Sequence, residues 1–154
     1  MIILFGGLIT LFIAVIGIIL YVLLAVGLYG MAKNAGIGNE WFAFIPILQM
    51  YIIGKILKEV KIANYTVPQL ELVLPLAPIA VSIAGYILGI IPVLGDLVAL
   101  LLNIAYLIFN IIVLYNLYKK YKGEGAVLMT VLSVILFFMM PIYIFTLRNS
   151  TPIE

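Results

Sequence analysis

The first 32 residues carry no charged side chain, and this run constrains the fold more than any other feature of the sequence. A bilayer core of about 30 Å is crossed by roughly 20 apolar residues in a helix. The composition of the whole chain also fits a membrane environment, because 67% of its residues are hydrophobic and 9% are charged. Soluble domains are about 45–50% apolar and 25% charged. We therefore expect an all-α integral membrane protein, with residues 1–154 forming one membrane domain.

Turn signals divide the apolar sequence into four expected transmembrane helices. The first is read as an uncleaved membrane helix, since a secretory signal needs a basic segment before a shorter apolar run. Thr66 and Gln69 form a capping-box pattern before the second helix, and Asp96 is a natural N-cap for the third. Pro141 lies inside the fourth. The expected spans are residues 2–31, 67–91, 97–118 and 126–147.

Residues 41–61, between the first two spans, are expected to form one further short helix. The apolar part, 42–57, has only about 16 residues, which is short for a crossing. It also carries Gln49, and the second half of residues 41–61 is amphipathic with three lysines. A re-entrant or interfacial helix is the favoured interpretation, and a fifth span is the alternative.

Positive charges predict the orientation. In the four-span arrangement, seven of the eight Lys and Arg residues fall in two loops on one side, and Arg148 lies opposite. The positive-inside rule places those lysine-rich loops in the cytoplasm, with both termini outside. A net charge of +2 with scattered lysines does not fit nucleic-acid binding, which needs a clustered basic face.

Polar side chains inside the spans are the candidates for function. Asn103, Tyr106 and Asn110 share one face of the third span, at spacings i, i+3 and i+7. Ser82 and Tyr86 of the second span are placed to face them. Such groups avoid lipid, so they either line a path for a solute or form interhelical hydrogen bonds. Glu71, about one turn into the second span, is a candidate cation or proton site or an interfacial carboxylate.

Small residues and aromatic–basic clusters mark further expected contacts. Small residues four apart let helix backbones approach closely, within the chain or between subunits; the candidates are Ala80, Ala84, Gly85 and Gly89. Aromatic rings and lysines at the ends of apolar segments are typical of anchoring at an anionic cytoplasmic leaflet. These expected anchors are Trp41, Tyr115, Tyr118, Lys119, Lys120, Tyr121 and Lys122.

The sequence has no Cys and no His. It therefore lacks thiolate or imidazole metal ligands, cysteine nucleophiles and Ser-His-Asp triads. With no intramembrane pair of acids either, no plausible acid–base set is present. We expect no catalytic residue, no metal and no cofactor.

Residues 35–51 resemble a module of small bacterial multi-span membrane proteins. In that module a Gly is followed by a Trp, then Ile-Pro, then an Asn and a Tyr; here the matching residues are Gly38, Trp41, Ile45, Pro46 and Tyr51. Gln49 stands where the module has Asn. A similar module occurs in the membrane portion of some signal peptidase-like proteins, and residues 117–149 resemble membrane proteins of clostridia-type bacteria. The resemblance implies a bacterial cytoplasmic membrane and no established activity.

The favoured function is a non-enzymatic accessory or assembly subunit of a larger membrane complex. Its partners would be the bilayer and another membrane protein or a second copy of the chain. The alternative is a small oligomeric channel or transporter for an ion or small solute, with the polar residues of the second and third spans as its lining.

Overall fold

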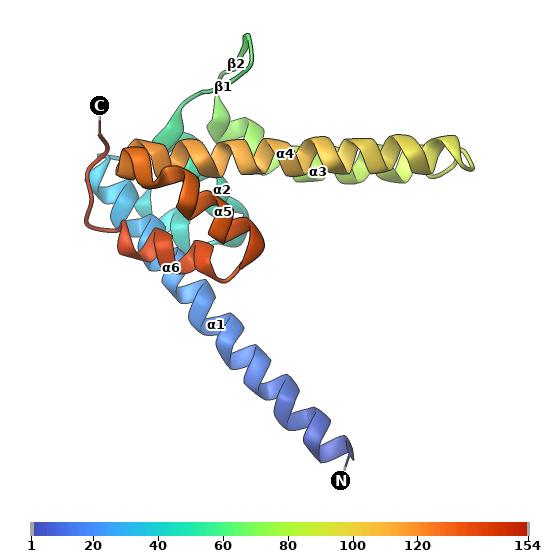
Figure 1. The fold of residues 1–154 in the computed structure, drawn as a ribbon, viewed down its shortest axis with the longest axis horizontal. Helices are drawn as coiled ribbons and strands as arrows, with labels where there is room; N and C mark the ends of the chain where they lie inside the picture. Colours follow the sequence, from blue (N-terminus) through green and yellow to red (C-terminus); the bar gives the residue numbers. More distant parts are fainter. Residues whose placement is uncertain (1, 154) are drawn as a thin grey trace.

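The computed structural model describes residues 2–153, with side chains described from Phe5 to Ile153. A compact body carries two apolar arms that leave it in different directions (Figure 1). One arm is the N-terminal part of helix α1, Ile2–Asn34, and the other is the pair α3, Leu70–Leu88, and α4, Leu94–Lys122. Between them lie α2, Pro46–Leu57, α5, Ala126–Ile135, and α6, Met139–Thr146. The remaining elements are the 3-10 helices η1, Glu40–Phe44, and η2, Gly123–Gly125, and the strands β1, Val60–Ile62, and β2, Tyr65–Val67.

Three stretches of the described chain are long and apolar enough to cross a membrane, which supports the membrane class. They are Phe5–Asn34, Leu70–Leu88 and Leu94–Ile135, the last of which runs from α4 through η2 into α5. Helix α1 alone, with 33 residues, is about 50 Å long at 1.5 Å per residue. The expected arrangement of four spans plus one short helix is not confirmed.

Residues 35–57 leave one end of the body and return to it. The descending part, through η1, brings Phe44 beside the middle of α1, where the Tyr21 hydroxyl donates a hydrogen bond of 2.5 Å to the Phe44 carbonyl oxygen. Tyr21 lies about 20 Å along α1 from Asn34, at 1.5 Å per residue. Helix α2, with 12 residues, then returns toward the end of the body where Asn34 lies. Pro46 occupies its first turn, where a missing N–H costs no helical hydrogen bond.

The expected fourth span, 126–147, is instead a second hairpin. Helix α5 has ten residues and α6 has eight, so neither reaches the length of a crossing. The helix breaks at Leu136, where φ is −117° and ψ is 80°. Pro141 contributes to the break, since it lacks an N–H and its ring would clash with the carbonyl of residue 137 in a continuous helix; the contact of Ile144 and Phe145 with Gly27 contributes as well.

This second hairpin corrects the expected charge distribution. The Asn34 side-chain amide donates to the Arg148 carbonyl oxygen at 2.9 Å, and the Ile153 N–H donates to the Lys120 carbonyl oxygen at 2.6 Å. Arg148 and the C-terminal tail therefore lie at the lysine-rich end of the body, not opposite it. We call this region the basic end, because Lys55, Lys58 and Lys120 lie there beside Asn34 and Ile153.

Glycines allow the closest contacts between segments. A Cβ added to Gly27 would lie 2.8 Å from the Ile144 carbonyl carbon and from the Phe145 nitrogen. One added to Gly54 would overlap the backbone of Leu70 and Glu71. The first contact packs α1 against α6, and the second packs α2 against α3.

The start of α3 also differs from expectation. Thr66 lies in β2, paired with Lys61 of β1, and therefore does not cap a helix. Gln69 is the N-cap residue, with φ 52° and no side-chain capping bond. The capping-box interpretation was wrong because Thr66 is paired with Lys61 in the β-hairpin, three residues before the N-cap of α3.

Candidate functional site

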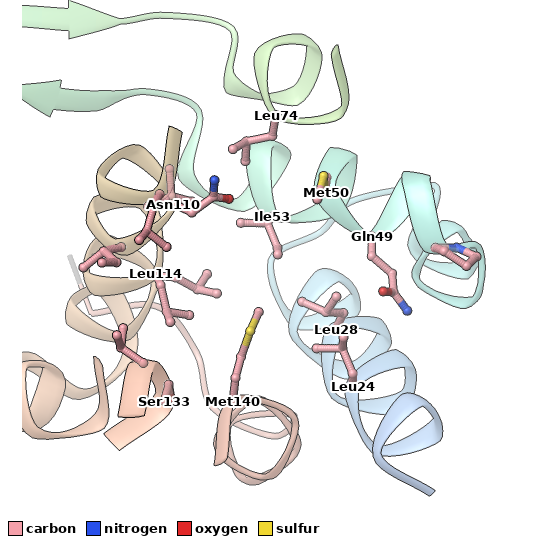
Figure 2. A pocket seen from close by; sticks show the side chains of 16 residues that line it. Leu24, Leu28, Gln49, Met50, Ile53, Leu74, Asn110, Leu114, Ser133 and Met140 are labelled. Carbon is pink, nitrogen blue, oxygen red and sulfur yellow. The ribbon is translucent and has the colours of Figure 1, made fainter. Parts of the chain in front are cut away.

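A central cavity of about 390 Å³ lies where the two hairpins face α1, α3 and α4. Side chains converge on it from several helices: Leu28 from α1, Ile53 from α2, Leu114 from α4 and Met140 from α6 (Figure 2). Its lining is mostly aliphatic. Such a space can hold an apolar group, with only a few polar groups to orient it.

Three polar side chains reach this cavity. The Gln49 amide, 8% exposed, donates to the Ala43 carbonyl oxygen at 3.0 Å. The Asn110 amide donates to the Tyr106 carbonyl oxygen at 2.7 Å. The Ser133 hydroxyl is hydrogen-bonded to the Tyr118 hydroxyl at 2.9 Å. Each amide uses one of its two N–H donors in these bonds, so both keep capacity for a further partner.

The expected polar stripe is dispersed by the fold. Asn110 lies on the central cavity, whereas Asn103 is exposed and its amide bonds the Ala99 carbonyl of its own helix at 2.8 Å. Tyr106 is half-buried one helical turn before Asn110. Among the described residues, none of these three side chains is hydrogen-bonded to another helix.

The candidates of the second span lie away from the central cavity. Ser82 bonds the Pro78 carbonyl at 2.7 Å and lines a separate apolar groove between α2 and α3. Tyr86 is 83% exposed on the distal arm. Glu71 is half-buried where α3 meets Gly54.

Small residues of α3 are not in tight contact with another segment. A Cβ added to Gly85 would meet nothing within 4 Å among the described residues, and one added to Gly89 would meet only backbone of its own helix. Ala80 is exposed and Ala84 is half-buried. Close packing within the chain occurs at other small residues, Gly27 and Gly54.

The expected interface anchors divide into two groups. Trp41 is 56% exposed, Lys119 and Lys122 are exposed, and the Lys119 ammonium lies 5.8 Å from the centre of the Tyr115 ring. Tyr118 and Tyr121, in contrast, are buried in the body. These two rings pack against protein, since α5 and α6 fold back over the end of α4.

The N-terminal half of α1 contains small residues that the fold leaves uncovered. Residues 5–19 are all exposed, and a Cβ added to Gly6 or Gly17 would meet nothing within 4 Å among the described residues. Spacings of i, i+4, i+8 and i+11 place four small residues on one helical face, which we call the small-residue face: Gly6, Thr10, Ala14 and Gly17. The spacing was visible in the sequence, but only the structure shows that this half lacks contacts.

Comparisons with known proteins do not assign this chain to a family. No protein-family description, curated protein or solved structure matches the chain. Among the described residues, no group of three or more His, Cys, Asp or Glu side chains is placed to hold a metal ion.

Proposed function

We propose that this protein is a non-enzymatic accessory subunit that binds a partner helix within the membrane. The partner packs along the small-residue face of α1. The observation that carries this proposal is the contrast between the halves of α1: Gly27 and Gly30 contact α6 and the residues after it, whereas Gly6 and Gly17 contact nothing described.

Membrane physics favours a protein partner at such a face. Helices in lipid associate by van der Waals packing, and small residues allow the close approach that this packing needs. The same helix already uses this device at Gly27 within the chain. A second helix laid on Gly6, Ala14 and Gly17 would gain the same kind of contact.

The basic end is proposed to face the cytoplasm. Lys55, Lys58, Lys120 and Arg148 lie at this end, and loops rich in Lys and Arg remain on the cytoplasmic side in the positive-inside rule. Asp96 lies at the far tip of the α3–α4 arm, in the first turn of α4. The chain would then cross the membrane three times, with its C-terminal tail inside.

Native mass spectrometry of the protein, extracted gently from its own membrane, tests the proposal. Ala14→Phe adds bulk on the small-residue face, and Val15→Phe adds bulk on the opposite face of the same exposed helix as a matched control. We expect a complex with another chain that Ala14→Phe dissociates and Val15→Phe leaves intact. A particle that contains a single copy of this chain, or equal effects of the two variants, would contradict the proposal.

A second candidate, passage of a small solute, is favoured by the central cavity between the two hairpins. Asn110 is the polar group of α4 on that cavity. Solute flux into liposomes that Asn110→Leu abolishes, with folding retained, would favour this function. A discrete homo-oligomer in the mass spectrum would point the same way.

A further inference from the structure

A second cavity, of about 810 Å³, opens at the basic end. The loop 34–39 forms one wall, the end of α2 forms another, and Pro152 and Ile153 of the C-terminal tail close it beside Lys120. Its volume falls in the range of about 300–1,000 Å³ that is typical of small-molecule sites. It is separate from the central cavity, with which it shares no lining residue.

The described charged residues of this cavity carry charge of one sign. Lys55, Lys58 and Lys120 line it, and the described residues of its wall include no carboxylate. Lys120 is held in place because its ammonium donates a hydrogen bond of 2.7 Å to the Ile56 carbonyl oxygen. Lys55 lies 5.6 Å from the centre of the Tyr51 ring. Lys120 is thus positioned by a hydrogen bond and is half-buried, whereas Lys55 and Lys58 are exposed.

The lysines also repel one another. Lys120 belongs to the last, charged turn of α4, beyond the apolar part of the helix. Lys58 and Lys120 line the same cavity, so an anion bound between them would relieve the repulsion of their like charges.

The opposite wall offers backbone and amide groups. Gly36 has φ +70°, and a Cβ added to Gly36 or Gly38 would meet nothing within 4 Å among the described residues. A ligand can therefore approach this backbone closely. Asn39 lies on the same wall.

We propose that this cavity binds a phosphate group, carried either by an anionic lipid headgroup or by a soluble phosphate ester. Lysine ammonium groups recognise phosphate as point charges, and basic pockets on the cytoplasmic side of membrane proteins hold lipid phosphates. Lys55, Lys58 and Lys120 contact the phosphate oxygens, and the loop 34–39 supports the remainder of the headgroup.

Native mass spectrometry of the full chain in detergent, with added probes, tests this site. The probes are phosphatidylglycerol, phosphatidylcholine, glycerol phosphate and inorganic phosphate. We expect phosphatidylglycerol to bind at least tenfold more tightly than phosphatidylcholine. A charge-assisted hydrogen bond contributes about tenfold in affinity, so Lys58→Gln with Lys120→Gln should weaken binding about a hundredfold.

Matched variants separate the site from general charge. Lys61→Gln with Lys122→Gln removes the same charge at two exposed lysines outside the cavity, and we expect it to change affinity less than threefold. The single variant Lys55→Gln serves as a second test if the loss of Lys120 disturbs folding. It should weaken phosphate binding about tenfold.

The outcomes identify the source of the phosphate or overturn the site. Lipid binding at least tenfold tighter than glycerol phosphate assigns a membrane headgroup. Glycerol phosphate or inorganic phosphate that binds as tightly, with the same dependence on Lys58 and Lys120, assigns a soluble ester. Equal binding of the two lipids without phosphate binding, or equal losses in the two double variants, would overturn the proposal.

Discussion

Replacing Gly27 by alanine should separate α1 from α6. The new Cβ would lie 2.8 Å from the carbonyl carbon and oxygen of Ile144 and from the nitrogen of Phe145, whereas ordinary contacts begin at 3.4 Å. The two backbones must then move apart by about 0.6 Å or more. These are backbone atoms, so no side-chain rotation can relieve the overlap.

The expected cost of Gly27→Ala is about 1–3 kcal/mol, the usual range for overpacking a tight interior contact. Alanine recovers up to about 1 kcal/mol of helix propensity, so a net loss of roughly 1–2 kcal/mol remains. For a chain of this size, each kcal/mol shifts the thermal midpoint by about 2–4 °C. Circular dichroism of the purified protein in detergent measures that midpoint.

Gly7→Ala is the matched control, on the same helix. Nothing described lies within 4 Å of a Cβ at Gly7, so alanine there adds helix propensity without overlap and should leave the midpoint unchanged or raise it. Equal midpoints for the two variants would refute the close approach of α1 and α6.

Three further perturbations follow from the body and the basic end. Tyr118→Phe leaves the buried Ser133 hydroxyl without its partner at 2.9 Å, which should cost about 1 kcal/mol; adding Ser133→Ala should cost little more, and additive losses in denaturant titrations would contradict the pairing. Gly54→Ala should destabilise the protein, since its Cβ would overlap the backbone of Leu70 and Glu71; an unchanged denaturation midpoint would argue against the α2–α3 contact. Lys58→Gln should raise stability at neutral pH, because it removes a like charge from the cavity that Lys120 also lines; an unfolding titration at pH 7 that shows no gain would contradict this repulsion.

The sequence predicts the helices better than their connections. The apolar runs that became α1, α3 and α4 are recognisable from length and composition alone. The helix after Pro46 was expected to be too short to cross the membrane. In the structure its C-terminal end lies beside residues 34–39, where the preceding loop begins. These features depend on local composition, which a single sequence displays.

The second hairpin shows where local reasoning stops. Pro75 and Pro78 lie inside α3, which continues through both, whereas the chain breaks before Pro141. The same residue type gives two outcomes because tertiary contacts differ. Residues 144–148 pack against Gly27 and Gly30 of α1, and that contact is available only if the chain turns back.

The polar side chains of α4 show a related difference between helical spacing and contact. Asn103 and Asn110 each donate a hydrogen bond to the carbonyl four residues earlier in α4. A side chain can thus satisfy a donor on its own helix without a partner helix, so helical spacing alone does not show that residues act together. The cavity at the basic end was also missed, because it joins residues 34–39, 55–58, 120 and 152–153.

Cysteine labelling decides most directly whether both hairpins return to the same end. The chain has no native cysteine, so single replacements at Ile2, Asn64, Asp96 and Thr151 can be probed in intact cells with a membrane-impermeant maleimide. We expect Ile2→Cys and Asp96→Cys to react from outside, and Asn64→Cys and Thr151→Cys to react only after permeabilisation. Labelling of Thr151→Cys from outside would show that residues 126–147 cross the membrane, and would contradict the three-crossing arrangement.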